Sequence, residues 1–155
     1  MRLRLVGQLM LIVALTLLIA SDVLAQGQQS DAKAEKQAGL EYWNKIDKEA
    51  IKTESGLQYK VLYAGTGRQP KRSSKVKVHY RGLTLDGRTF DTSYTDDEPV
   101  EMSLKSVIKG WKEGIPLMRG GSVYVFLIPP ELAYGEKGSA AIPPNATLIF
   151  EVELF

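Results

Sequence analysis

The chain has 155 residues, of which 44% are hydrophobic and 25% charged, with a formal net charge of +2 at pH 7. This composition is typical of one globular domain with some additional length, and the small net charge gives no support for a nucleic-acid partner. The chain has no cysteine and one histidine, which excludes a thiol nucleophile and argues against a zinc or other transition-metal site. We therefore expect neither a metal nor a cofactor.

Residues 1–25 have the layout of a secretory signal peptide. Arg2 and Arg4 precede an uncharged, mostly apolar run over residues 5–20, and the sequence V-L-A at 23–25 supplies a small-residue cleavage site. The alternative is an uncleaved leader that tethers the protein to the inner membrane, but the run is shorter than the roughly 20 apolar residues of a spanning helix. The sequence therefore predicts cleavage after Ala25 and a periplasmic or secreted protein.

Residues 26–52 are expected to form a polar linker and then a helix from Asp31 to Lys52, because Ala, Lys and Glu dominate this segment. An apolar stripe recurs along it at intervals of three or four residues: Leu40, Trp43, Ile46 and Ala50. The stripe either docks on the chain's own domain or belongs to a partner-binding or dimerising arm.

Residues 53–155 change to short strands separated by turn signals. In K-V-K-V-H-Y-R, Val76, Val78 and Tyr80 alternate with polar residues, so one face of this strand is buried. Asp86-Gly87 indicates a tight hairpin turn, and residues 123–128 and 147–155 indicate further strands. The pattern predicts an antiparallel sheet with one short internal helix, which is an α+β domain.

The short internal helix is unusual in composition. Residues 106–115 read S-V-I-K-G-W-K-E-G-I, and a glycine inside a helix costs roughly 1 kcal/mol relative to alanine. Helix propensity therefore does not explain why Gly110 and Gly114 stand beside Val107, Ile108 and Trp111.

Five ordered motifs in this domain resemble those of the FKBP-type peptidyl-prolyl isomerases. They are V-H-Y-R-G at 78–82, D-G-R-T-F-D-T-S at 86–93, V-I-K-G-W-K-E-G at 107–114, I-P-P-E-L-A-Y-G at 128–135 and I-P-P-N-A-T-L-I-F-E-V-E-L at 142–154. The chain is most similar to the exported bacterial branch that includes the macrophage infectivity potentiator type, in which an N-terminal helix precedes the domain.

The resemblance implies an FKBP-like half-barrel of five or six antiparallel strands curled around one short helix, with an apolar pocket between them. It implies catalytic roles for Tyr80, Phe90, Asp91, Trp111 and Tyr134, and substrate contacts from Val100, Val107, Ile108, Ile142 and Phe150. Trp111 would form the pocket floor and hold the prolyl ring together with Phe90 and Phe150. Gly110 would let the chain turn tightly into the helix.

The polar groups of the pocket have implied roles as well. The Ile108 backbone N–H and the Tyr134 hydroxyl would bind substrate carbonyls. Asp91 would form a hydrogen bond with Tyr80 and interact with the carbonyl that rotates. An aspartate beside Phe90 in an apolar sheet is itself a sign of a partner or a task.

The resemblance predicts an isomerase that accelerates X-Pro isomerisation during the folding of exported proteins. Its partners would be proline-containing, unfolded or partly folded polypeptides, with macrolides as candidate inhibitors. The helical arm is only about 30 Å long at ~1.5 Å per residue, so we expect a monomer. Val100 stands where many relatives have an aromatic residue, and the rim at 138–143 is short. The alternative is a holdase chaperone or peptide-binding module that uses the same pocket with little turnover.

Overall fold

The computed structural model describes residues 41–45 and 48–155 of the chain. The expected signal peptide, the linker, the first part of the helical arm and two members of its apolar stripe, Leu40 and Ile46, lie outside the described residues. In the part that the structure describes, no helix has the length and apolar character needed to cross a membrane.

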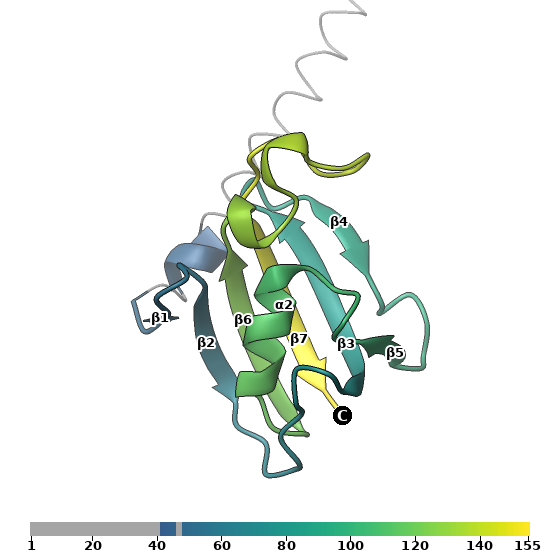
Figure 1. Cartoon of the computed structure of the whole chain (residues 1–155). Helices are drawn as coiled ribbons and strands as arrows, with labels where there is room; N and C mark the ends of the chain where they lie inside the picture. Colours follow the sequence, from purple (N-terminus) through teal and green to yellow (C-terminus); the bar gives the residue numbers. More distant parts are fainter. Residues whose placement is uncertain (1–40, 46–47) are drawn as a thin grey trace, which may run out of the picture. The chain divides into compact units, whose positions relative to one another are not determined.

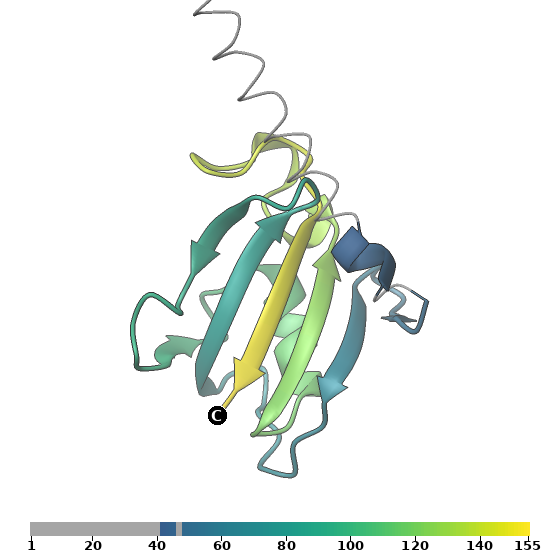
Figure 2. The same ribbon diagram turned by 180° about the vertical axis from the view of Figure 1, so that it is seen from behind.

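One antiparallel sheet of seven strands organises the domain, in the order β1-β2-β6-β7-β3-β4, with β5 paired to the first part of β3 (Figures 1 and 2). The strands are β1 (Ile51–Lys52), β2 (Gln58–Tyr63), β3 (Lys75–Thr84), β4 (Thr89–Thr92), β5 (Val100–Ser103), β6 (Ser122–Ile128) and β7 (Leu148–Leu154). The predicted α+β class is confirmed. The sheet has more than the expected five or six strands because the two-residue β1 adds to β2 at one edge.

The main core lies between this sheet and the helix α2 (Lys109–Gly114), which continues into the 3-10 turn η1 (Ile115–Leu117). Figure 1 shows α2 lying across one face of the sheet. Val76 and Val78 on β3 and Phe150 and Val152 on β7 are buried in this core. The alternation predicted for β3 is thus confirmed, with Tyr80 half-buried in the middle of the buried series.

The two glycines of α2 allow the helix to approach the sheet closely. A Cβ atom on Gly110 would lie 2.5 Å from Cγ2 of Ile128, and one on Gly114 would lie 2.6 Å from Cε1 of Phe126. Neither glycine has a positive φ. The expectation that Gly110 serves a tight turn is therefore wrong: this glycine is needed because β6 leaves no room for a side chain.

We expect Gly110→Ala to lower the free energy of unfolding by about 1–3 kcal/mol, because Ile128 is fully buried and, being β-branched, adjusts poorly. In an Ile128→Ala background the clashing atoms are gone, and the same change should become neutral or stabilising, since alanine favours a helix over glycine by roughly 1 kcal/mol. A double-mutant cycle by urea denaturation measures this coupling. Equal effects in both backgrounds would contradict the close-approach explanation.

The segment before the sheet corrects the predicted end of the helical arm. Residues 41–45 are helical, but Lys48 and Glu49 form a turn, and Ile51–Lys52 is strand β1, paired with Tyr59 and Gln58. The helix predicted to reach Lys52 therefore ends earlier. Helix propensity is a weak preference that strand pairing at a sheet edge overrides.

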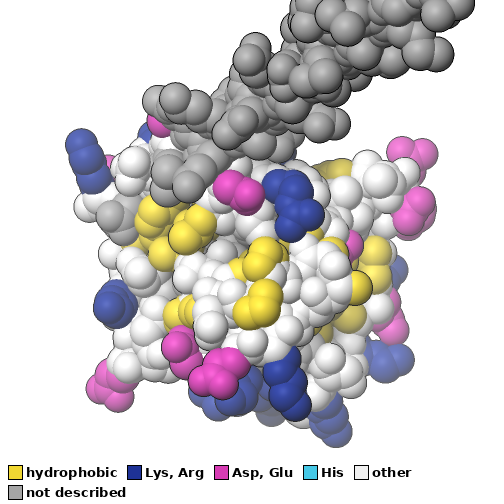
Figure 3. All heavy atoms as spheres, turned by 90° about the horizontal axis from the view of Figure 1, so that it is seen from above, with side chains coloured by type: hydrophobic (Ala, Val, Ile, Leu, Met, Phe, Trp, Pro, Cys, Tyr) yellow, Lys and Arg dark blue, Asp and Glu magenta, His cyan; other side chains and the backbone are white. Residues whose placement is uncertain are grey.

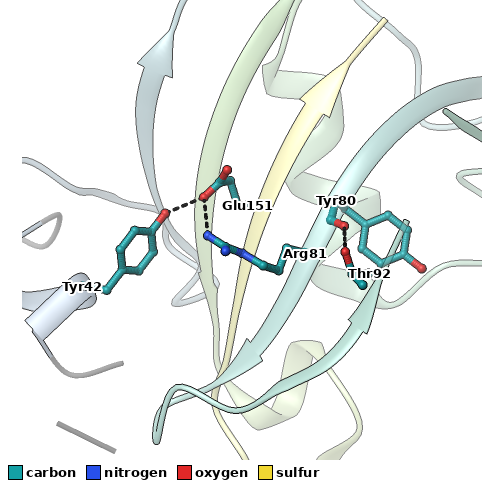
Figure 4. Close-up of polar contacts among 5 residues, drawn as sticks. All are labelled: Tyr42, Tyr80, Arg81, Thr92 and Glu151. Atoms are coloured by element: carbon teal, nitrogen blue, oxygen red, sulfur yellow. Dashed lines mark hydrogen bonds and ion pairs between the residues drawn. The ribbon is translucent and has the colours of Figure 1, made fainter. Parts of the chain in front are cut away.

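The described part of the apolar stripe docks on the chain's own domain. Trp43 is 8% exposed and packs with Val125, Leu127 and Ile149 on the face of the sheet opposite α2. Tyr42 donates a hydrogen bond of 2.7 Å to Glu151 Oε2, which also accepts one from Arg81 (Figure 4). The Tyr42–Trp43 region thus supports docking of the stripe on the chain's own domain over a partner-binding or dimerising arm.

Candidate active site

A cavity of about 310 Å³ opens between α2 and the sheet. Its lining residues are Tyr80, Asp91, Met102, Ser106, Val107, Ile108, Trp111, Tyr134 and Phe150. They come from β3, β4, β5, α2 and the residues before it, the connection after β6, and β7. The structure thus brings together seven of the ten residues proposed from the sequence.

Aromatic rings in edge-to-face contact form the inner end of the cavity. The centroid of the Phe150 ring lies 5.4 Å from that of Trp111, and the Trp111 centroid lies 5.2 Å from that of Tyr80, with interplanar angles of 81° and 88°. Trp111 and Phe150 are each 4% exposed. This arrangement is one that aromatic pairs prefer, and it gives the cavity a rigid apolar floor.

A phenol–carboxylate pair lies at the mouth of the cavity. Tyr80 Oη donates a hydrogen bond of 2.8 Å to Oδ2 of Asp91, as the resemblance implied. The Thr92 hydroxyl donates to the Tyr80 carbonyl at 3.2 Å, which holds β4 against β3 beside this pair (Figure 4). Burial first, and then the bond to Asp91, raises the pKa of Tyr80 well above its ordinary value. The phenol therefore remains a neutral donor at physiological pH.

We expect alkaline pH to weaken the fold through two tyrosines. Burial and a carboxylate partner raise the pKa of both Tyr42 and Tyr80 in the folded protein. Above pH about 10 the unfolded chain loses these protons first, so the free energy of unfolding should fall as the pH rises. Urea denaturation from neutral to alkaline pH should show a shallower decline for Tyr42→Phe and for Tyr80→Phe. If the free energy of unfolding falls with pH as steeply in both variants as in the wild type, the raised pKa values of Tyr42 and Tyr80 would be contradicted.

The residues before α2 contribute backbone as well as side chains to the cavity. Ile108 precedes the helix with φ −58° and ψ 156°, and its carbonyl accepts hydrogen bonds from the N–H groups of Trp111 and Lys112. The first N–H groups of a helix have no partner within the helix. The backbone N–H groups around Ile108 are therefore available as hydrogen-bond donors at the rim of the cavity. They lie beside the half-buried side chains of Val107 and Ile108.

Three of the proposed residues do not line the cavity. Phe90 is not among the lining residues, but its ring is in edge-to-face contact with that of Phe150, with 5.5 Å between the ring centroids. Ile142 is 4% exposed and belongs to the main core, whereas Val100 is 37% exposed on β5. Phe90 thus packs against the aromatic floor, and Val100 and Ile142 are not among the lining residues.

Sequence reasoning missed Met102 and Ser106, which do line the cavity. Met102 lies opposite the buried Val76 in the β3–β5 pairing, just as Val100 lies opposite Val78. Residues two apart on a strand share a face. Val100 is a predicted wall residue, so the two-residue repeat of the strand could have identified Met102 as a further one. No comparable signal marks Ser106.

Volume alone does not distinguish this cavity from two other hollows in the described residues. One of about 340 Å³ is lined by residues such as Arg68, Lys75 and Phe155, and one of about 430 Å³ by the turn at Asp86 and residues near Pro143. Neither combines several aromatic rings with a carboxylate and a phenol. Figure 3 views the molecule from above and shows hydrophobic side chains in separate groups, with charged side chains around the margin and between these groups.

A metal centre finds no support in the described part of the chain, where no group of three or more His, Cys, Asp or Glu side chains is placed to hold an ion. The groups that the cavity offers for chemistry are its aromatic, aliphatic and hydroxyl side chains and the Asp91 carboxylate.

Residues 66–155 match the family model described as FKBP-type peptidyl-prolyl cis-trans isomerase. Because this match covers more than half of the chain, the protein belongs to that family. Two curated relatives are similar over most of the chain. The chain is 48% identical over 128 residues to FkpA of Escherichia coli strain K12, an FKBP-type peptidyl-prolyl cis-trans isomerase, covering 81% of this chain and 47% of the relative. It is 46% identical over 123 residues to the peptidyl-prolyl cis-trans isomerase Mip of Coxiella burnetii, covering 78% and 53%.

Solved structures agree with this assignment. The crystal structure of FkpA from Escherichia coli aligns with a TM-score of 0.69 and 41% identity, over 92% of this chain and 70% of that one. The crystal structure of AtFKBP13 aligns with a TM-score of 0.63 and 35% identity, over 68% and 96%. The chain spans about half the length of the curated relatives it matches. Similarity to FkpA and Mip places it with the branch that the sequence motifs indicated.

Proposed function

We propose that this chain is a peptidyl-prolyl cis-trans isomerase acting on proline-containing, unfolded or partly folded polypeptides. The observation that carries the proposal is the aromatic cavity with the Tyr80–Asp91 pair at its mouth. Its volume of about 310 Å³ suits a small apolar group such as a prolyl ring.

The physics of the reaction supports this use of an apolar cavity. Rotation about an X-Pro bond breaks no covalent bond, but its barrier of about 18–20 kcal/mol reflects the loss of amide resonance. The twisted amide is less polarised than the planar one, so a water-poor cavity disfavours the planar state relative to the twisted state. A millionfold acceleration requires about 8 kcal/mol of such preference.

Six of the lining residues then have a task in the proposed reaction. Trp111 and Phe150 hold the prolyl ring, and Phe90 packs edge-to-face against Phe150 and keeps it in place. Carbonyls of the substrate are bound by the Ile108 backbone N–H and by the Tyr134 hydroxyl. The Tyr134 side chain is 40% exposed, on the rim of the cavity.

Asp91 remains fixed by Tyr80 and interacts with the carbonyl of the residue before proline as it rotates. No nucleophile, proton transfer or cofactor is needed, so the neutral Tyr80 phenol serves to position the carboxylate.

A protease-free isomerisation assay on short X-Pro peptides tests the proposal, with a macrolide present and absent. Catalysis that the macrolide suppresses supports an isomerase with this cavity as its site. The alternative is a holdase or peptide-binding module in which the cavity binds but turns over little. It predicts an uncatalysed rate together with suppression of client aggregation.

We also propose export through a cleaved signal peptide and a monomeric mature protein. The support is the R-x-R start, the apolar run and the V-L-A site within residues 1–25, and the docking of Trp43 on its own domain. The intact mass of protein recovered from an exporting host should correspond to a chain beginning at Gln26. A retained leader would favour the membrane-tethered alternative.

A further inference from the structure

The outer side of strand β2 is only partly covered by another strand. Strand β1 pairs with Gln58 and Tyr59 and then stops. Within the described residues, no strand pairs with the outer side of residues 60–63. Both ribbon views show this part of β2 at the edge of the sheet (Figures 1 and 2).

The backbone of β2 is oriented to accept a further strand there. The Thr53 N–H donates to the Leu57 carbonyl at 2.9 Å, so Leu57 directs its backbone groups toward the β1 side. Because backbone direction alternates along an antiparallel strand, Tyr59 and Val61 direct theirs to the same side. An added strand would therefore meet the N–H and C=O of Val61, in the line that β1 leaves open.

The side chains at this edge are apolar and accessible. Val61 is 36% exposed, Leu62 46% and Tyr63 65%. Protein edges are commonly protected by lysine, but Lys60 is turned to Glu49, with 2.9 Å between Nζ and Oε2. The side chains of residues 61–63 are uncharged, although the register of β2 against β6 shifts between Val61 and Tyr63. An exposed apolar edge is a template for strand addition.

We propose that the β2 edge binds an extended, non-native polypeptide segment by strand addition, forming a second polypeptide-binding site apart from the cavity. The choice of occupant rests on the proposed function, because an isomerase of unfolded chains meets extended segments. Backbone pairing also accepts any sequence. The free edge has about four residues and is about 13 Å long. Pairing along so short an edge buries little surface, whereas a stable interface buries roughly 1,200–2,000 Å². This argues against a second copy of this chain as the occupant.

The two sites are separate, since the cavity between α2 and the sheet is lined by residues of β3, β4, β5 and β7 and by none of β2. A long unfolded polypeptide can occupy the cavity and the β2 edge at the same time. Once it is bound at one site, binding at the other is intramolecular, which raises the overall affinity of the polypeptide for the protein. Short peptides reach only the cavity. The edge should therefore matter for unfolded proteins and not for peptide substrates.

The test compares three variants of the full mature protein. Leu62→Lys/Tyr63→Lys removes the exposed apolar contacts, and Val61→Pro removes the N–H that the alternation directs away from β6. Tyr94→Lys is the matched control, because Tyr94 is 49% exposed but lies at the end of β4, across the sheet. The probe is reduced, carboxymethylated α-lactalbumin, which is permanently unfolded, and fold integrity is checked by circular dichroism.

We expect both edge variants to bind the unfolded probe about tenfold more weakly, while isomerisation of a short X-Pro peptide stays within about twofold of wild type. If Val61→Pro does not fold, the lysine variant alone decides. Unchanged probe binding in a folded edge variant, or an equal loss in Tyr94→Lys, would overturn the proposal.

Two further outcomes separate this proposal from the proposed function. A wild type that binds the probe through the edge but does not isomerise peptides would support the edge site and refute the isomerase. Light scattering that shows a wild-type dimer which the edge variants convert to monomer would assign the edge to a second copy, and would overturn the proposal.

Discussion

Phe150→Ala is expected to lose most of the isomerase activity and to lower the free energy of unfolding by about 3–5 kcal/mol. The Phe150 ring contacts the rings of Tyr80, Phe90 and Trp111 and is 4% exposed. Removing it takes away part of the cavity floor and leaves a void that its neighbours cannot fill. Activity and urea denaturation have to be measured side by side, because loss of fold would otherwise be mistaken for loss of catalysis.

Phe126→Ala is the matched control for this loss. Phe126 is paired with Phe150 across β6 and β7 and is 1% exposed, but it does not line the cavity. We expect a similar loss of stability, also about 3–5 kcal/mol, with activity largely retained under conditions in which the variant is folded. Equal loss of activity in both folded variants would show that the cavity floor has no special part in the reaction.

Asp91→Ala should lower the isomerase activity at least several-fold while changing the stability little. The side chain is exposed and its described hydrogen bond is the one from Tyr80, so its removal costs about 0.5–1.5 kcal/mol. The reason for the expected kinetic effect is the loss of the carboxylate that we propose interacts with the rotating carbonyl. Tyr80→Phe keeps the carboxylate but frees it, and should give a smaller loss.

Asp97→Ala provides the control for charge. Asp97 is an exposed carboxylate in the connection between β4 and β5, and removing it changes the net charge as Asp91→Ala does. Peptide isomerisation rates should be near wild type in Asp97→Ala. If both aspartate variants lose activity alike, a general charge effect explains the result and Asp91 has no individual role.

Most of the cavity residues could be predicted from the sequence because five of its motifs resemble those of the isomerase family, and two features of these motifs also stand out on physical grounds. Asp91 is a carboxylate beside an aromatic residue, and Trp111 sits between two glycines of a short helix. The meaning of those glycines required coordinates. Their closeness to Ile128 and Phe126 depends on how α2 crosses β6, and no periodicity in the chain encodes that crossing.

The N-terminal segment shows the opposite limit. Composition indicated a helix up to Lys52, but Ile51 and Lys52 pair with β2, because hydrogen bonds at a sheet edge outweigh small differences in propensity. The same edge gives β2 its half-covered outer side. Neither feature could be predicted from residues 48–63 alone, since both depend on where the paired strand stops.

The most direct test of the central claim is the rate of cis-to-trans exchange in a short X-Pro peptide, measured without a protease by NMR exchange spectroscopy. We predict strong acceleration by the wild-type protein, suppression by a macrolide, and a large loss in folded Phe150→Ala but not in folded Phe126→Ala. Exchange at the uncatalysed rate, tens of seconds at 25 °C, in the presence of folded wild-type protein would contradict this prediction.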